Sequence, residues 1–477
     1  MHFYLISILI LTFFGSIFAY FPLNYYDIFS LYTIEKKDTL GYSLKYQPFN
    51  KKQIDINTLS DYEKTLYQYY NNLTNYNRIY LDILGINIFY PDSIDYKYIS
   101  TLRYEDSLFS ASLGYIIDSR FYERYYPWVK DRPVRARMYD SRFVLKYNDF
   151  NIGIKREDYN IGYPLEYSML FSNNPYSYDR FFISYVNNFF NFEVFTALLN
   201  PLYSKDSIYY YRRVYGKYIN LRLKYDRILL VPGFKEGFVV ARTSDMVEYR
   251  DLYPFSFWFL NMMNRENKGN AIISFDLLLK YINLFNYYIS FTIDDWQIDN
   301  KTIGDTEPNL YGLEMFFDFF LNRNLSIGVR YKRITPWMYN VWYLEERYTY
   351  YNLSLGTPRN NSLLYGIYLN YDYKKIRFYF DFYVEKNGWN NILYKMENYY
   401  YWLGYPEEYP LVYGNMAIEE VYNYSFYIKY LYYLKLEFAY RNIYNKDNIY
   451  NNNIKGINVS LTTYLKMFYN IKKDKLW

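Results

Sequence analysis

Two adjacent carboxylates, Asp294 and Asp295, are the side chains in this sequence most suggestive of chemistry. Two carboxyl groups in one site can divide the acid and base roles of a catalyst. This pair, however, ends a predicted β-strand, in which adjacent residues point to opposite faces. We therefore expect a cation site, or a hydrogen bond to loop backbone, rather than a shared catalytic proton, and we count both residues among the candidates for glycan binding.

Short polar side chains form a second candidate at Ser172, Asn173 and Asn174. Ser and Asn side chains hydrogen-bond to nearby backbone groups and stabilise turns. The same hydroxyl and amide groups can bind the hydroxyl groups of a glycan. The cluster therefore predicts either a capped turn or a glycan contact.

The densest basic cluster consists of Arg132, Arg135 and Arg137, with Lys130 and Asp131 beside them. Guanidinium groups bind carboxylates and phosphates through paired hydrogen bonds. The cluster can bind an acidic polysaccharide or the phosphates of lipopolysaccharide. The alternative is a solvated loop surface whose charge Asp131 partly offsets.

Tryptophans provide the fourth kind of candidate, because an indole ring either joins an aromatic girdle at a membrane interface or stacks on the CH face of a sugar. Trp128 and Trp402 fit sugar stacking best, since they lie near the centres of long predicted loops. The tryptophans in predicted outer loops or outer strand ends are Trp128, Trp258, Trp296, Trp337, Trp342, Trp389 and Trp402. The candidates for glycan binding among them are Trp128, Trp337, Trp342, Trp389 and Trp402.

The rest of the composition limits the chemistry. The chain of 477 residues contains no cysteine and a single histidine, His2, which lies in a predicted export signal. Without His or Cys, the mature chain has no Ser-His-Asp triad, Cys-His pair or His/Cys metal site. We expect no cofactor and no enzymatic activity. The net charge of +5, without a dense Lys/Arg tract, argues against nucleic-acid binding.

The N-terminus predicts export followed by a small helical region. Residues 5–19 read LISILILTFFGSIFA, an apolar run of signal-peptide length, so we expect residues 1–19 to be removed by cleavage after Ala19. An N-terminal membrane anchor is the alternative. Apolar residues at spacings of three and four then predict a helix over 58–74, and a shorter one is plausible over 25–35. We interpret residues 20–75 as a helical periplasmic plug region.

From residue 76 the sequence alternates with a period of two, which predicts β-strands. Residues 325–332 place Leu, Ile, Val and Tyr on one face and Ser, Gly, Arg and Lys on the other, and residues 376–385 and 434–441 alternate in the same way. Many strands of about ten residues with one aromatic-rich apolar face are typical of a transmembrane β-barrel. The charges that we expect in the lumen are Arg330, Lys332, Arg377, Asp381, Glu385, Lys435, Glu437 and Arg441.

Tight turns between these runs set the number of strands. Eight turns give sixteen strands, and a first strand near 78–90 and a last one near 456–468 make eighteen. An even number lets the first and last strands pair and close the sheet. We predict an all-β fold, an antiparallel transmembrane barrel of about 18 strands over 76–470, with a tail at 471–477. The turns lie at Asp106–Ser107, Asn148–Asp149, Asn187–Asn188, Asp226–Arg227, Asn283–Asn286, Asn322–Asn324, Lys374–Lys375 and Tyr432–Tyr433.

The other connections are long, and outer-membrane barrels carry their long loops outside the cell. We therefore assign all of them to the extracellular rim. They span 118–137, 156–178, 200–218, 233–270, 335–362 and 387–422.

Several segments, in this order, resemble the capsule assembly Wzi family of outer-membrane proteins. They begin with PFNKKQI at 48–54 and YPLEYSMLFSNNPYSYDRFFISY at 163–185. LNMMNRENKGNAIISFDLLLKY at 260–281, with YYISFTIDDWQID at 287–299, resembles the family's segment with paired aspartates at a strand end. YTYYNLSLGTPRNNSLLYG at 348–366 resembles a late loop of the family. At 161–164 the chain has Ile-Gly-Tyr-Pro where the family usually has a tryptophan- and glycine-rich turn.

The resemblance implies a barrel of about eighteen strands with a helical periplasmic plug, which binds, anchors or helps assemble capsular or exopolysaccharide at the cell surface. We expect a monomer in the outer membrane of a Gram-negative-type bacterium, in contact with lipid, lipopolysaccharide and the barrel-assembly machinery. The alternative is a passive porin-like channel for small solutes, which the charged lumen faces favour. An outer-membrane hydrolase and a soluble secreted β-protein fit the sequence less well.

Overall fold

A computed structural model describes most of the chain between residues 78 and 470. The described residues are 78–89, 94–105, 108–118, 136–139, 141–157, 159–162, 167–172, 174–175, 177–187, 189–203, 209–244, 257–263, 269–295, 309–341, 344–350, 353–388, 418–430, 434–449 and 452–470. The predicted signal peptide, the helices predicted at 25–35 and 58–74, and the tail 471–477 lie outside the described residues.

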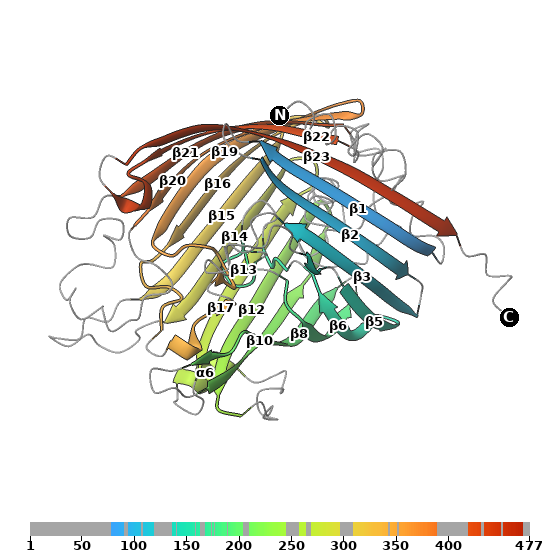
Figure 1. Ribbon diagram of the computed structural model, residues 1–477, viewed down its shortest axis with the longest axis vertical. Coiled ribbons are helices and arrows are strands. Elements are labelled where there is room, and N and C mark those ends of the chain that lie inside the picture. The colour runs from blue at the N-terminus through green and yellow to red at the C-terminus, as the bar shows by residue number, and fades with distance from the viewer. Residues whose placement is uncertain are drawn as a thin grey trace.

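Eighteen strands form a closed antiparallel β-barrel, as the sequence predicts. β1 pairs with β23 from Arg78–Asn470 to Phe89–Val459, and this pairing closes the sheet. In chain order the strands are β1 (Arg78–Phe89), β2 (Ile94–Glu105), β3 (Phe109–Asp118), β4 (Ala136–Met138) continued by β5 (Ser141–Tyr147), β6 (Phe150–Arg156), β7 (Arg180–Val186), β8 (Phe190–Leu198), β10 (Tyr209–Leu221) continued by β11 (Leu223–Tyr225), β12 (Ile228–Arg242), β13 (Asn270–Tyr281), β14 (Phe285–Asp295), β15 (Leu310–Phe320), β16 (Leu325–Ile334), β19 (Ser362–Tyr373), β20 (Ile376–Asn387), β21 (Glu419–Tyr430), β22 (Leu434–Tyr444) and β23 (Ile454–Asn470). Figure 1 shows them as one curved wall.

The eight predicted turns all connect neighbouring strands of this barrel. Four of them place a residue in the left-handed backbone region: Asn148, Asp226, Asn283 and Lys374. Asn and Asp tolerate this region better than other non-glycine residues, which explains why they occur in these tight turns. The turns therefore fix one rim of the barrel, which we call the short-turn rim.

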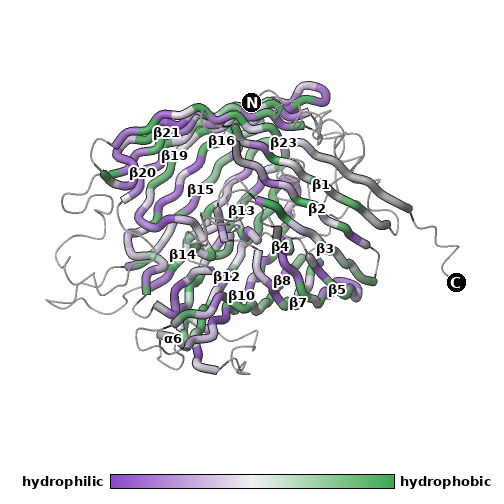
Figure 2. Tube along the Cα trace, in the orientation of Figure 1, coloured by the Kyte–Doolittle hydropathy of each residue, from purple (hydrophilic) through white to green (hydrophobic). Residues whose placement is uncertain are grey.

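The two faces of the wall differ in polarity. On β16, Ile327 and Val329 are 38% and 46% exposed on the outside, whereas Arg330 and Lys332 are buried on the inside. Figure 2 shows the same alternation of apolar and polar residues along the strands. An apolar outer face around a polar interior is the arrangement of an outer-membrane barrel.

No helix among the described residues is long and apolar enough to cross a membrane.

Long connections lie at the opposite rim, which we call the long-loop rim. The loops predicted at 118–137, 156–178, 335–362 and 387–422 correspond to connections between strands. They contain the short elements η3 (Leu344–Glu346), β17 (Thr349–Tyr350) and β18 (Leu353–Ser354). η5 (Lys446–Asn448) lies between β22 and β23 on the same rim.

Two predicted loops include long stretches of strand. After the short strand β9 (Leu202–Tyr203), β10 already begins at Tyr209, inside the loop predicted at 200–218. β12 continues to Arg242 in the loop predicted at 233–270, which also contains the helix α6 (Trp258–Met263). Both strands are buried on both faces over part of these stretches, at 214–218 and 235–240, where their sequences lose the alternation that identifies a one-sided strand.

Candidate functional site

The lumen contains two connections that fold inward from the long-loop rim, and we call them plug loop 1 (157–179, between β6 and β7) and plug loop 2 (335–361, between β16 and β19). They bind each other through hydrogen bonds to backbone carbonyl groups. Ser172 N donates to Leu355 O at 2.7 Å, and the Tyr339 hydroxyl donates to Met169 O at 2.5 Å. These bonds join segments that are far apart in sequence, so the two loops form one unit, the plug.

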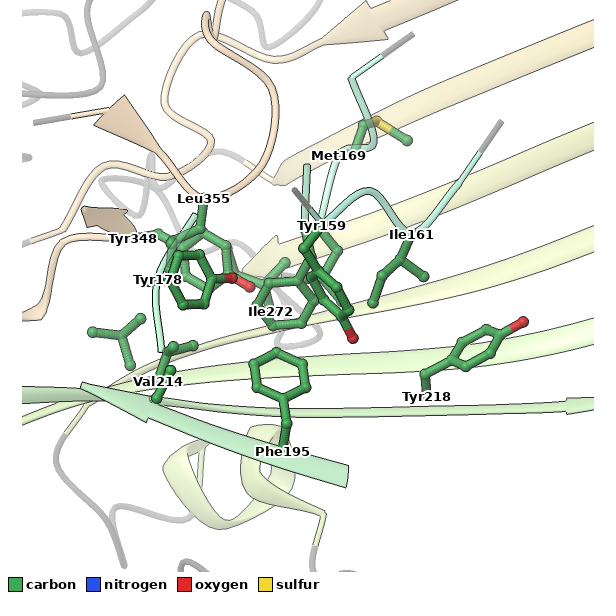
Figure 3. Close-up of a cluster of buried hydrophobic side chains, with 14 of the residues drawn as sticks. Tyr159, Ile161, Met169, Tyr178, Phe195, Val214, Tyr218, Ile272, Tyr348 and Leu355 are labelled. Atoms are coloured by element: carbon green, nitrogen blue, oxygen red, sulfur yellow. The ribbon is translucent and has the colours of Figure 1, made fainter. Parts of the chain in front are cut away.

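A buried apolar cluster holds the plug against the lumen wall. Phe171 and Tyr178 from plug loop 1, and Tyr348 and Leu355 from plug loop 2, are each 2% exposed or less. Phe195 of β8 contacts Phe171, with ring centroids 5.0 Å apart. Figure 3 shows side chains from the wall and from both loops meeting in this cluster. Apolar packing of this kind excludes water from that part of the lumen.

Glycines in the wall provide the space that the plug occupies. A Cβ at Gly237 of β12 would overlap the Tyr348 hydroxyl and the Phe171 ring. A Cβ at Gly312 of β15 would overlap the Met169 sulfur. Any larger residue at these inward positions would displace the plug side chains, so the wall is shaped to accept this plug.

Two lysines on the wall hold the backbone of plug loop 1. The Lys235 ammonium donates to Ile161 O at 2.7 Å and forms an ion pair with Asp276. Lys332 donates to Tyr167 O. Because both lysines are buried, their hydrogen bonds to loop carbonyls replace water that the groups would otherwise need.

Arg212 of β10 performs the same task for plug loop 2. Its side chain is almost fully buried, and its guanidinium donates to Glu345 O at 2.7 Å, to Thr349 O at 3.1 Å and to Arg347 O. Five fixed donors on a planar group suit this binding of several carbonyls. Plug loop 2 is therefore fixed by a charge-assisted hydrogen-bond cluster.

Ionic side chains surround the start and end of plug loop 1. Glu157 lies 3.2 Å from Lys155 and 3.3 Å from Arg180, and Lys155 also pairs with Glu193 at 3.4 Å. Burial raises the pKa of Glu157, but Lys155, Arg180 and Arg142 more than offset that effect and lower the pKa to about 2. The Arg180 guanidinium also lies 3.4 Å from the centroid of the Tyr159 ring. Charge pairing thus anchors the loop at both of its ends.

The paired aspartates take different positions, as the alternation predicts. Asp294 points into the lumen, is 4% exposed, and accepts a hydrogen bond from Tyr339 N at 2.5 Å. Asp295 lies on the opposite face and is half-buried, next to a register shift between Ile293 and Asp295. The expected hydrogen bond to loop backbone is therefore present. Burial, followed by the charge of Asp294, raises the pKa of Tyr339 well above its usual value.

The polar cluster Ser172 and Asn174 links the two plug loops. The Ser172 hydroxyl accepts a hydrogen bond from Asn174 N at 3.1 Å and donates to Gly356 O. The Asn174 amide donates to Ser354 O at 2.9 Å. Both side chains are buried, so they show the turn chemistry that the sequence predicts, and their contact with a glycan stays a prediction.

A narrow pocket lies between plug loop 1 and the wall. Tyr218, Lys235, Asp276 and Tyr288 line it together with Gly162. Its charged groups already bind one another, since Asp276 accepts the Ser290 hydroxyl at 2.7 Å and pairs with Lys235. No group of three or more His, Cys, Asp or Glu among the described residues is arranged to hold a metal ion.

The other predicted binding residues are distributed differently. Trp337 is buried in plug loop 2, and Arg137 lies half-buried in β4, paired with Ile116, rather than in a loop. The strand therefore begins earlier than predicted. The candidates outside the described residues are Trp128, Arg132, Arg135, Asn173, Trp342, Trp389 and Trp402.

Charged side chains predicted for the lumen do face it. Arg330 binds Asp381 through bonds of 2.6 and 2.8 Å, and Lys435 lies 2.7 Å from Glu437. Arg377 pairs with Asp372 at 2.6 Å.

Sequence reasoning missed the plug itself. The nearest signal in the sequence is glycine at inward positions of strands that otherwise carry large residues, such as Gly237 and Gly312.

Comparison with solved structures places this fold among outer-membrane barrels. Wzi of Escherichia coli, described as an outer-membrane protein involved in group 1 capsule assembly and a carbohydrate-binding β-barrel, is similar with a TM-score of 0.57 and 8% identity, over 96% of this chain and 100% of that one. OprD of Pseudomonas aeruginosa gives a TM-score of 0.43 at 8% identity, over 82% and 95%. OccK1 (OpdK) of the same organism gives 0.48 at 8%, over 82% and 98%. No protein-family model and no curated protein sequence matches the chain.

Proposed function

We propose that this chain is a plugged barrel of the bacterial outer membrane that binds, anchors or helps assemble capsular or exopolysaccharide at the cell surface. It acts without enzymatic chemistry, as a lectin-like protein. The observation that carries the proposal is the plug: an apolar cluster and three buried basic side chains fix two long loops across the wall of the lumen. Some outer-membrane barrels have a water-filled channel and others have an interior plugged by loops, and two loops held in this way fit the second kind.

The fold supports the same role. Wzi, a carbohydrate-binding barrel, matches almost the whole chain in fold, although the low identity carries no residue roles over. Tryptophans in the long loops, with Trp128 and Trp402 foremost, supply stacking faces for sugar rings. Arg132 and Arg135 beside Trp128 supply charge for an acidic polysaccharide or for lipopolysaccharide phosphates. The proposed partners are this glycan, the outer-membrane lipid and the barrel-assembly machinery, and the proposed form is a monomer.

The test is retention of the cell's own surface polysaccharide by purified protein in detergent. We expect the wild type to retain it and the Trp128→Ala/Trp402→Ala double variant to lose most of it, because each removes a stacking surface. Trp337→Phe is the matched control, since Trp337 is buried in the plug and offers no surface to a glycan. Equal retention by wild type and the double variant would contradict the proposal.

The alternative is a passive channel for small solutes. One observation favours it: on β22, Arg441 is exposed and Glu437 is 29% exposed at the side chain. Charged walls of this kind line solute pathways. Planar-bilayer recording separates the two functions, because a stable large conductance of the wild type supports the channel, whereas a silent wild type supports the plugged lectin.

A further inference from the structure

The outer face of the barrel carries an ion pair, where lipid would be expected. Lys217 of β10 and Glu236 of β12 are register partners that form an ion pair, and both side chains are 2% exposed or less. Their inward neighbours on the same strands, Gly216 and Lys235, face the plug, so Lys217 and Glu236 face outward. A charge pair on the lipid face is costly unless something covers it.

Helix α6 covers it. Lys217 Nζ lies 4.5 Å from the centroid of the Trp258 ring and 4.9 Å from that of Phe257. Phe259 N donates to Glu236 Oε1 at 2.6 Å, so the carboxylate also fixes the start of the helix. Cation–π contacts and a charge-assisted hydrogen bond therefore attach α6 to the outside of the wall, next to β12 and β13 (Figure 1).

An apolar cluster secures the same contact. Trp258 and Phe259 are buried against Tyr215, Phe238 and Ala271, which are register partners on β10, β12 and β13. These wall residues lie on the face opposite to the plug, whose cluster uses Val214, Val239 and Ile272 of the same strands. The wall is thus covered on both faces here, by the plug inside and by α6 outside.

At the start of α6, two apolar side chains remain exposed, Phe257 directly before the helix and Leu260 within it. Phe257 and Leu260 are 53% and 54% exposed. Phe257 continues into the outer wall, with its ring centroid 5.8 Å from that of Phe234, which in turn lies 5.5 Å from Phe275. Phe275 is 50% exposed on the outer face, so the surface of α6 is continuous with the lipid-facing belt.

The height of α6 on the wall agrees with the edge of a membrane. Phe238 lies ten residues along β12 from Ile228, which is at the short-turn rim. At a rise of about 3.3 Å per residue and a strand tilt of about 40°, this distance corresponds to about 25 Å along the barrel axis, which is the height of the apolar band of such barrels. Beyond it, toward the long-loop rim, Arg213 and Arg242 are diagonal neighbours on the same outer face. Charged side chains at this height are expected where hydrocarbon ends and headgroups begin.

We propose that α6, with Phe257 directly before it, is an interfacial anchor, and that Phe257 and Leu260 insert among the acyl chains of outer-leaflet lipid. We assign lipid as the partner of these side chains because their surface continues the lipid-facing belt and lies at the edge of that belt nearest the long-loop rim. The anchor goes beyond polysaccharide binding and rests only on the placement of the barrel in an outer membrane. It fixes the depth of the barrel and shields the ion pair from lipid.

The chain contains no cysteine, so Leu260→Cys introduces a single thiol that can carry a nitroxide label. The full chain is reconstituted into phospholipid vesicles, and the label's collisions with oxygen and with a water-soluble nickel chelate are compared. Val329→Cys, on the outer face of β16, is the lipid reference, and Lys374→Cys, in a tight turn, is the aqueous reference.

We expect the label at position 260 to collide severalfold more with oxygen than with nickel, as at position 329 and unlike position 374. Nickel access equal to that at position 374 would overturn the anchor while leaving the barrel and its glycan role intact. Disulfide cross-linking of Leu260→Cys between two copies, with little access to either reagent, would assign the surface to a second copy and would also overturn it. Nickel access at position 329 would refute the membrane placement itself, and the anchor with it.

Discussion

The wall from β10 to β16 and the wall of β22 and β23 are built by the same alternation, yet inward side chains near the long-loop rim are buried on the first and exposed at Arg441 on the second. On β10 to β16, inward residues such as Val214, Val239 and Ile334 are buried against the plug, and Gly237 and Gly312 leave room for plug side chains. On β22 and β23, Arg441 is exposed beside its register partner Gly456, at which an added Cβ would meet nothing within 4 Å. Alternation decides which side chains face inward, and the size of those side chains decides whether a loop can pack on them.

Exchanging glycine for leucine at these two places tests the comparison most strongly. Gly237→Leu would overlap Tyr348 and Phe171, and overpacking of this kind lowers the free energy of unfolding by about 3 kcal/mol, the upper end of its usual range. We expect the displaced plug to expose these aromatic residues to chymotrypsin and to open the lumen to ions. Denaturant titration in vesicles, limited proteolysis and planar-bilayer recording measure the three effects.

Gly456→Leu is the matched control, because it adds the same side chain to an inward strand position with free space around it. It should leave stability, cleavage and conductance close to those of the wild type. If Gly237→Leu behaved like Gly456→Leu, the packing of the plug would not depend on the space that the inward glycines leave. The contrast between the two walls would then have another cause.

The two faces of β14 offer a second, smaller comparison. Asp294→Leu removes the carboxylate that accepts Tyr339 N, and a buried N–H without a partner costs about 2 kcal/mol. Asp295→Leu changes the opposite, half-buried face and should cost much less. Asp294→Asn keeps an acceptor and should restore most of the loss. Equal losses for the two leucine variants, by denaturant titration, would show that the hydrogen bond to plug loop 2 is not what Asp294 contributes.

The strand number, the eight turns and the inward charges follow from the sequence because each depends on local rules. Left-handed turn residues such as Asn148 and Asp226 stop one strand and start the next. Period-two alternation on β16 and β20 then separates inward from outward residues, as the buried Arg330 and Asp381 confirm.

The sequence failed where two packing partners meet one strand. β10 and β12 are covered inside by the plug and outside by α6, so Val214 and Tyr215 are both buried although they point to opposite faces. A strand with two buried faces has no polar side, and its sequence resembles an irregular segment. The misassigned loops at 200–218 and 233–270 coincide with this doubly covered part of the wall.

The plug could not be predicted because its contacts join residues far apart in the chain. Ser172 and Leu355 meet only after plug loops 1 and 2 have both folded inward, and Arg212 binds carbonyls more than 130 residues away. No local pattern distinguishes a loop that folds into the lumen from one that extends outside. Inward glycines on several neighbouring strands are the nearest sign of a loop packed in the lumen. They can be recognised as inward only once the strand register is known.

Acid should destabilise the plug by protonating Glu157, and we expect this loss of stability to be smaller than those of the Gly237 and Asp294 variants. The pKa of this carboxyl falls from an ordinary 4.5 to about 2 in the folded chain, since Lys155, Arg180 and Arg142 outweigh its burial. A lowered folded-state pKa means that the carboxylate stabilises the fold above pH 4.5 and loses that contribution as the pH falls toward 2. At pH 3.5 the loss amounts to about 1 kcal/mol.

Glu157→Gln cannot ionise, so its stability at neutral pH should already be lower, and its further loss on acidification should be smaller than that of the wild type. Denaturant titration of both proteins at a series of pH values from 7 to 3.5 measures the difference. Parallel pH profiles for the two proteins would show that the charges around Glu157 do not hold the loop.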